Sequence, residues 1–197
     1  MRAVVQRVSR GSVEVDGQVV GAIDAGLVVL VCAMEDDTDA DVAWLAAKLP
    51  ALRIWPDAAG GDGRLQLALA DFEPARRQLL IISQFTLSAD LGPGISKGNR
   101  PAFTRAMAPV PAEAMVADLM TRLAGAGCVV AGGRFGAHMV VSLMNDGPVT
   151  LWLDTRRSPS RQQPQSSSPS PFRERGPGGE VATGTGAVDS NTKKGGA

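Results

Sequence analysis

The sequence has no tyrosine, a single histidine and only two cysteines among its 197 residues. One histidine and two widely separated cysteines do not complete the ligand set of a zinc site, and no carboxylates occur at metal-ligand spacing. A phosphate-binding loop and a dinucleotide fingerprint are also absent from the sequence. We therefore predict a protein with no metal site and no cofactor.

The scarcity of histidine also restricts nucleophilic catalysis, because His138 is the only imidazole available as a general base. A pair of His138 with Cys32 or Cys128 stays open, but both cysteines lie in apolar runs, where thiols are normally inert.

Reduced, buried cysteines are typical of the cytosol. No apolar run reaches the roughly 18 residues of a spanning helix, and no signal peptide is visible. We expect a cytoplasmic protein without a membrane partner.

Charge is balanced over the whole chain but not along it. Residues 1–154 carry 13 Lys or Arg and 17 Asp or Glu, whereas residues 155–197 carry seven and three. Ser, Pro, Gln and Gly dominate the second segment, which leaves little that can pack. We predict one folded domain over residues 1–154 and a disordered, functionless tail over residues 155–197. Weak, salt-sensitive contact of this basic tail with RNA is the alternative.

The hydrophobic pattern predicts strands separated by two helices. The expected strands are 2–8, 13–23 with a hairpin at Asp16–Gly17, 27–32, 53–55, 65–69, 78–83, 129–130, 139–144 and 149–153. One helix is expected to begin near Thr38 and to end at Pro50. The other is expected to run from Pro111 to Ala124, with Gly125 as its stop signal.

Two short stretches stand out from this pattern. Asn145–Thr150 lies between two apolar runs and predicts the rigid turn of a strand–turn–strand unit, because Asn, Asp and Gly tolerate left-handed backbone and Pro fixes φ. Ser83–Leu87 ends the most apolar predicted strand. Its hydroxyls, amide and main-chain N–H groups can hold a carbonyl oxygen as it becomes an oxyanion. The alternative for the first stretch is an ordinary hairpin turn. The alternative for the second is a strand end whose polar groups only form hydrogen bonds with one another.

Together these two stretches resemble the paired signatures of the D-aminoacyl-tRNA deacylases, of the D-tyrosyl-tRNA deacylase type. The resemblance covers about residues 1–154 and extends to Val5–Val8, Leu52–Ile54, Arg100–Phe103 and Gly133–Gly136. It implies an α/β fold with a mixed, mostly antiparallel sheet, a barrel-like core and flanking helices. The sequence departs from the family pattern at Arg64–Leu67 and in the loop Leu91–Asn99, which puts tRNA contacts of that loop in question.

The resemblance implies an enzyme that hydrolyses the ester between a D-amino acid and the 3′ end of tRNA. The implied catalytic segment, which would bind the terminal adenosine and the aminoacyl group, is Ser83, Gln84, Phe85 and Thr86. The nucleophile stays open between the Thr86 hydroxyl, a water and the 2′-hydroxyl of the tRNA, and we expect Thr86 to position the substrate. An RNA 3′-end binding module without catalysis and an ordinary carboxylesterase are the alternative functions.

The same resemblance implies a homodimer with its active sites at the subunit interface. Gly147 and Pro148, joined by a cis peptide bond, would enter the pocket of the partner chain. Their backbone would form a wall that rejects L-amino acids and admits glycine. Arg7 would brace this turn.

Overall fold

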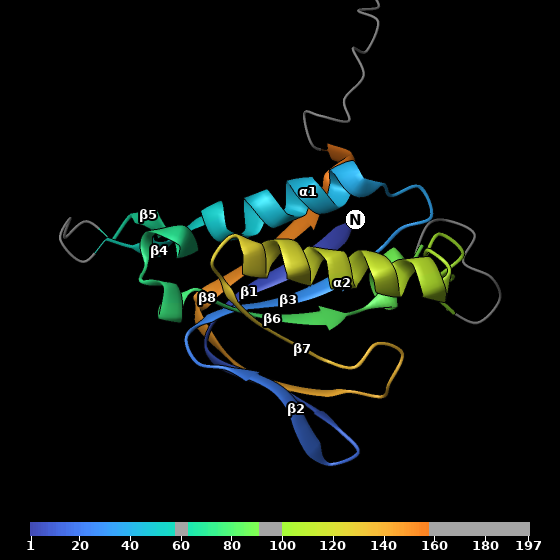
Figure 1. Ribbon diagram of the computed structural model, residues 1–197, viewed down its shortest axis with the longest axis horizontal. Coiled ribbons are helices and arrows are strands. Elements are labelled where there is room, and N and C mark those ends of the chain that lie inside the picture. The colour runs from blue at the N-terminus through green and yellow to red at the C-terminus, as the bar shows by residue number, and fades with distance from the viewer. Residues whose placement is uncertain (58–62, 91–99, 158–197) are drawn as a thin grey trace, which may run out of the picture. The chain divides into compact units, whose positions relative to one another are not determined.

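The computed structural model describes residues 1–57, 63–90 and 100–157. Six strands form a mixed sheet in the order β2-β1-β3-β6-β7, and β8 also pairs with β1 (Figure 1). These strands are β1 (Arg2–Val15), β2 (Gln18–Ile23), β3 (Gly26–Cys32), β6 (Gln78–Ser83), β7 (Val129–Gly132) and β8 (Val140–Asp154); a second sheet pairs β4 (Arg53–Pro56) with β5 (Leu65–Ala68). The helices are α1 (Asp39–Lys48), α2 (Pro109–Gly125) and the 3-10 helices η1 (Leu49–Ala51), η2 (Leu69–Asp71), η3 (Pro74–Arg76), η4 (Phe85–Ser88) and η5 (Thr155–Arg157). Every predicted strand is present, and the sheet is mixed as expected.

The first strand organises the sheet, because both of its halves have neighbours on both sides. Residues 2–8 pair with β3 and with residues 145–154 of β8, whereas residues 11–15 pair with β2 and with residues 140–143. All of these pairings are antiparallel, while β3, β6 and β7 run parallel to one another. The predicted strand 2–8 and the first arm of the predicted hairpin, residues 13–15, are therefore one continuous strand, β1, and the return arm of the hairpin is β2.

The sheet curls almost into a closed barrel where β2 approaches β7. A Cβ atom on Gly21 would lie 2.6 Å from the carbonyl oxygen of Gly132, so the two strands approach this closely only because Gly21 has no side chain. A cluster of buried residues fills the inside of the curl: Val8, Val13, Ile23, Val28, Leu80 and Ile82. The barrel-like core that the family resemblance implies is thus present as a nearly closed sheet.

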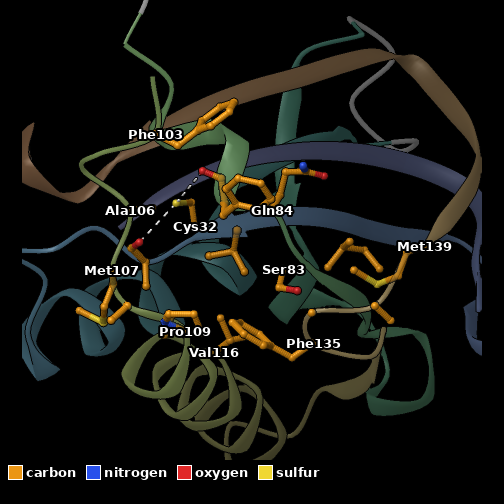
Figure 2. Close-up of a pocket in the computed structure, with 18 of the residues that line it drawn as sticks. Cys32, Ser83, Gln84, Phe103, Ala106, Met107, Pro109, Val116, Phe135 and Met139 are labelled. Carbon is orange, nitrogen blue, oxygen red and sulfur yellow. Dashed lines mark hydrogen bonds between the residues drawn. The ribbon is translucent and has the colours of Figure 1, made fainter. Parts of the chain in front are cut away.

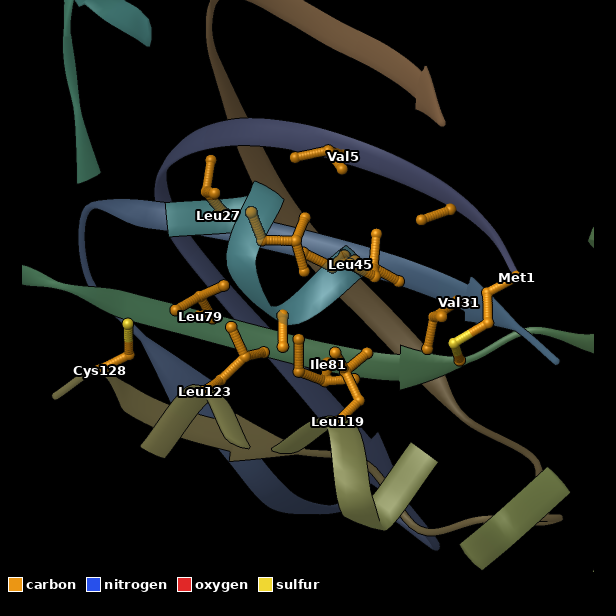
Figure 3. Close-up of a cluster of buried hydrophobic side chains, with 14 of the residues drawn as sticks. Met1, Val5, Leu27, Val31, Leu45, Leu79, Ile81, Leu119, Leu123 and Cys128 are labelled. Carbon is orange, nitrogen blue, oxygen red and sulfur yellow. The ribbon is translucent and has the colours of Figure 1, made fainter. Parts of the chain in front are cut away.

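The other face of the sheet is covered by α1 and α2, which lie side by side (Figure 1). Figure 3 shows Leu45 of α1 and Leu119 and Leu123 of α2 among the aliphatic side chains of β3 and β6. Burying one such side chain contributes about 1.5–3 kcal/mol. None of the helices in the described ranges is long and apolar enough to cross a membrane.

The ends of the helices follow local capping chemistry. Thr38 is the N-cap of α1, and its backbone N–H donates to the Asp41 carboxylate at 2.8 Å, as predicted for this position. Helix α2 begins at Pro109 and ends at Gly125, two residues before the predicted start at Pro111 and one residue after the predicted end at Ala124. The glycine that terminates the helix is not the predicted Gly125. Gly127 has a φ of +80°, and its N–H donates to the carbonyl oxygen of Ala124, while that of Cys128 donates to Leu123. The left-handed residue after the helix is therefore Gly127.

The predicted strand–turn–strand unit at the end of the domain is a single strand, β8. Val8 of β1 pairs with Asn145 and Gln6 pairs with Thr150, so residues 146–149 lie opposite Arg7 alone. The motif is thus a wide bulge and not a chain reversal, because both flanking apolar runs pair with the same long strand in the same direction.

The prediction of a cis bond between Gly147 and Pro148 is wrong, because this bond is trans in the structure. Gly147 has a φ of +117°, a value that glycine adopts without strain. This positive φ changes the chain direction within the bulge, so a cis bond is not required to form it.

The described chain continues three residues past the predicted domain boundary at 154. Thr155 begins η5 and is fully buried, and its N–H donates to the carbonyl oxygen of Met1 at 2.9 Å. The N-terminal ammonium group, also buried, forms an ion pair with Asp37 at 2.6 Å. The rest of the predicted tail and the loop Leu91–Asn99 lie outside the described residues.

Candidate active site

A pocket of about 690 Å³ opens beside the carboxyl ends of the parallel strands β3 and β6 (Figure 2). Its wall is built from residues 31–33 and 82–85 at these strand ends, from Phe103, from the start of α2 and from residues 135–139 before β8. Ligands commonly bind beyond the carboxyl ends of parallel strands, because the chain leaves the sheet there and exposes backbone polar groups. The wall is mainly apolar, and the described residues that line it include no Lys, Arg, Asp or Glu.

The predicted catalytic segment forms part of this wall. Ser83 is the last residue of β6, and the N–H of Gln84 donates to the carbonyl oxygen of Val31 at 2.7 Å, which directs the chain out of the sheet. Ser83, Gln84 and Phe85 line the pocket, whereas Thr86 is not among its lining residues. The amide of Gln84 donates to the hydroxyl oxygen of Thr86 at 2.5 Å. Three of the four predicted residues therefore reach the pocket, and the fourth is held by one of them.

Aromatic side chains stand at both sides of the pocket. Phe85 is 60% exposed and contacts Phe103 edge to face, with ring centroids 5.2 Å apart. Figure 2 shows Phe135 and Val116 across the pocket from Gln84. Phe103 and Phe135 are not among the predicted site residues, although both lie in stretches that carry the family resemblance. The signal that was available is their position beside glycine and proline turns.

The thiol in the pocket is not an activated nucleophile. Burial, followed by the negative charge of Asp37, raises the pKa of Cys32 to about 11. Its Sγ donates to the carbonyl oxygen of Ala33 at 3.3 Å. His138 also lines the pocket, but among the described residues no hydrogen bond joins it to Cys32. Cys128 lies in the apolar core, so neither Cys–His pair is supported.

Arg7 lies directly opposite the bulge of β8 and contacts it. Its side chain is buried, and its Nε donates to the carbonyl oxygen of Asp146 at 3.1 Å. Its Nη1 donates to the carbonyl oxygen of Ile54. A Cβ atom on Gly147 would collide with Nη2 of the same guanidinium. The structure thus places Arg7 against the Gly147 bulge.

The amide of Asn145 closes the base of the bulge. Its Nδ2 donates to the carbonyl oxygen of Arg7 at 3.0 Å and to that of Val149 at 3.2 Å. These contacts bridge the carbonyl groups of β1 and β8 across the interruption of the ladder between the two strands. The bulge is therefore held from both sides by side chains.

The bulge and the catalytic segment lie far apart within one chain. Gly147 is opposite Arg7, which pairs with Leu27 of β3, whereas Ser83 pairs with Val31, four residues farther along β3. Four strand residues span about 13 Å, and the three steps from β8 to β6 span about 14 Å. Neither Gly147 nor Pro148 lines the pocket. One chain alone does not bring the two motifs together.

No three His, Cys, Asp or Glu side chains gather into a group that could hold a metal ion within the part of the chain that the structure describes. The polar groups that the pocket wall presents beside Cys32 and His138 are the Ser83 hydroxyl, the Gln84 amide and the backbone of this strand end. Such a site can stabilise an oxyanion without a titrating side chain.

Comparison with known proteins agrees with this description. The family model described as D-Tyr-tRNA(Tyr) deacylase matches residues 4–154. A protein of Dinoroseobacter shibae named D-aminoacyl-tRNA deacylase is 47% identical over 154 residues, which are 78% of this chain and 99% of that protein. A protein of the same name from Magnetococcus marinus is 48% identical over 155 residues, 78% of this chain and 96% of that protein.

Solved structures resemble the same part of the chain. One, titled "c-Myc DNA Unwinding Element Binding Protein", matches with a TM-score of 0.67 and 35% identity over 78% of this chain and 98% of that chain. Another, titled "Structural Analysis of a probable eukaryotic D-amino acid tRNA deacylase", is 17% identical and shares the fold, with a TM-score of 0.64 over 77% of this chain and 97% of that chain. The chain belongs to a family of ester-bond hydrolases, the D-Tyr-tRNA(Tyr) deacylase family, as the resemblance of its two motifs predicted.

Proposed function

We propose that this chain hydrolyses the ester bond between a D-amino acid and the 3′-terminal ribose of tRNA, releasing the free amino acid and the tRNA. Family membership and the names of the relatives support this activity. The observation that carries the mechanism is a pocket whose wall offers polar backbone at a strand end but no activated nucleophile. In the cytoplasm such an activity would remove D-amino acids before translation, as a proofreading step.

The donors for the carbonyl oxygen come from the start of η4. The N–H of Gln84 is already bonded to Val31, so the available groups are the N–H groups of Phe85 and Thr86. A helix leaves its first N–H groups without intrahelical partners, and these groups can face a developing oxyanion. The attacking oxygen then comes from water or from the 2′-hydroxyl of the tRNA. Thr86 does not line the pocket itself, so in this scheme it positions the substrate indirectly, by holding the Gln84 amide that does.

The active site is completed by a second copy of the chain in our proposal. The separation of Gly147 from Ser83 within one chain supports this arrangement, because neither Gly147 nor Pro148 lines the pocket that Ser83 lines. The strand that carries the bulge is 15 residues long and exposes large apolar side chains, including Met144 and Trp152, which are about half exposed. Long strands with exposed apolar side chains are typical of surfaces that become buried in an assembly.

Selection against L-amino acids follows from a wall made of backbone. Rejecting L-aminoacyl-tRNA a thousandfold requires about 4 kcal/mol, whereas hydrophobic pocket fit distinguishes small groups by only about 1–3 kcal/mol. A bulge pinned by the buried Arg7 yields little, so an L side chain directed at Gly147 and Pro148 would meet a rigid obstacle. Glycine places only hydrogen there, and glycyl-tRNA would therefore be hydrolysed as well.

The test is to follow loss of the ester from D-alanyl-, L-alanyl- and glycyl-tRNA. We expect hydrolysis of the D-alanyl and glycyl esters and survival of the L-alanyl ester. Binding without ester loss would indicate an RNA 3′-end binding module, and equal cleavage of both alanyl esters and of simple esters would indicate an ordinary carboxylesterase.

The shared site of the proposed dimer has its own test. Mixing a chain defective at Gly147 with one defective at Gln84 should restore activity that neither has alone. A fully active monomer would contradict the shared site.

A further inference from the structure

Arg134 directly precedes two residues that line the pocket, and it has no acidic partner among the described residues. The N–H of Ala137 donates to the carbonyl oxygen of Arg134 at 3.2 Å, and Gly136 has a φ of +72°, so residues 134–137 form a tight turn. Phe135 and Gly136 in this turn line the pocket, whereas the side chain of Arg134 is exposed. The turn therefore holds one arginine beside the entrance of an apolar pocket.

A second arginine near the pocket differs in its charge environment. Arg105 lies between the pocket residues Phe103 and Ala106, but its guanidinium is 3.7 Å from a carboxylate oxygen of Glu35 and 3.8 Å from one of Asp36. Its charge is thus largely balanced within the protein. Arg134 has no ion pair in the described ranges, so its charge is available to a ligand.

The proposed substrate defines which anion such a cation can meet. In an aminoacyl ester the carboxyl group of the amino acid is consumed, and the amino group is positive. The only negative groups near the ester are the phosphates of the 3′ strand. Residues 1–154 carry 13 basic and 17 acidic side chains, so the domain as a whole does not attract RNA. A local, unbalanced cation beside the pocket is therefore required.

We propose that Arg134 binds a backbone phosphate of the single-stranded 3′ end of tRNA as this end enters the pocket; this inference rests on the proposed function. The guanidinium is planar and always charged, and it can donate two parallel hydrogen bonds to a phosphate. The contact fixes the path of the strand at the rim and leaves the terminal nucleoside and the ester to the pocket. Arg134 is thus a substrate-binding residue outside the reacting centre.

The experiment compares Arg134→Gln with the matched control Arg105→Gln on D-alanyl-tRNA and on D-alanyl-adenosine, which has no phosphate. Arg134→Gln should lower kcat/KM for the tRNA substrate about tenfold, the loss of one charge-assisted contact, and leave cleavage of D-alanyl-adenosine unchanged. Arg105→Gln should change both substrates by less than about twofold, since its charge is already balanced. Arg134→Lys, which keeps the charge but not the planar fork, should lie between wild type and Arg134→Gln.

The salt dependence of tRNA binding tests the phosphate contact of Arg134 without the adenosine substrate. Each phosphate contact to a single strand contributes about 0.7 to the slope of log affinity against log salt, so Arg134→Gln should flatten the slope by about this amount. An unchanged slope, or an equal loss on tRNA and on D-alanyl-adenosine, would overturn the proposal. Failure of the wild-type protein to cleave any D-aminoacyl ester would instead refute the proposed function, while the slope of tRNA binding would still test Arg134.

Discussion

Replacing Gly147 with alanine tests how the bulge of β8 is held. Gly147 has a φ of +117°, which L-residues with a Cβ atom rarely adopt, and a Cβ atom at this position would collide with Nη2 of Arg7. The guanidinium has no free space to retreat into, because Arg7 is only 6% exposed and is bonded to Asp146 and Ile54. The substitution therefore combines backbone strain with displacement of a buried cation.

The expected loss of stability is the sum of these two effects. A residue held in a sparsely populated backbone region costs about 1–3 kcal/mol. Breaking one hydrogen bond of a buried charged group costs about a further 1.5–3 kcal/mol. We expect Gly147→Ala to lower the free energy of unfolding by about 2.5–6 kcal/mol, a large part of the typical total of about 5–15 kcal/mol for a domain.

The measurement is urea unfolding of all variants at one protein concentration, because association with a second chain would also contribute to stability. Gly17→Ala is the matched control, since Gly17 has a φ of +76° with nothing within 4 Å of an added Cβ atom. Gly17→Ala should therefore show only the loss of stability that comes from backbone strain. Gly147→Ala in an Arg7→Met background should also cost only the strain, which gives a coupling energy of about 1.5–3 kcal/mol between the two positions. Equal losses for Gly147→Ala and Gly17→Ala, or a coupling energy near zero, would refute the bracing of the bulge by Arg7.

Three further predictions concern the pocket and the chain start. Thr86→Ala should retain at least partial single-turnover activity, because an unactivated hydroxyl is a weak nucleophile; a trapped acyl-enzyme on Thr86 would contradict this. Asp37→Asn should lower the unfolding free energy by about 3–5 kcal/mol, since it removes the closer of the two carboxylates, Asp37 and Asp41, that pair with the buried Met1 ammonium, whereas the exposed control Asp36→Asn should cost less than about 1 kcal/mol in the same melts. Iodoacetamide should hardly label Cys32 at pH 8, where a pKa of about 11 leaves about one thiol in a thousand ionised, and labelling should rise toward pH 11; rapid labelling at pH 7.5 would disprove the raised pKa.

The sequence by itself determined the elements whose signals are local. Strands β3 and β6 appear as continuous apolar runs because both of their faces are buried, and Thr38 begins α1 because its N–H and the Asp41 carboxylate form a cap within one turn of chain. The two site motifs were also visible in the sequence. The residues alone, however, were equally compatible with an ordinary hairpin turn and with a strand end whose polar groups bond only to one another. Their family resemblance, and not their spacing, selected the function.

Only the tertiary structure decided how these pieces meet. Asn145–Thr150 encodes a tolerance for unusual backbone, which suits a hairpin turn and a bulge equally; pairing of both flanking runs with β1 selects the bulge, and the positive φ of Gly147 forms it with a trans peptide bond. The contact of Arg7 with this bulge joins residues about 140 positions apart, and the pocket joins Cys32, Gln84 and Phe135 from three separate segments. Such long-range pairings depend on which strands are neighbours in the sheet, and the local pattern of side chains does not predict which strands become neighbours.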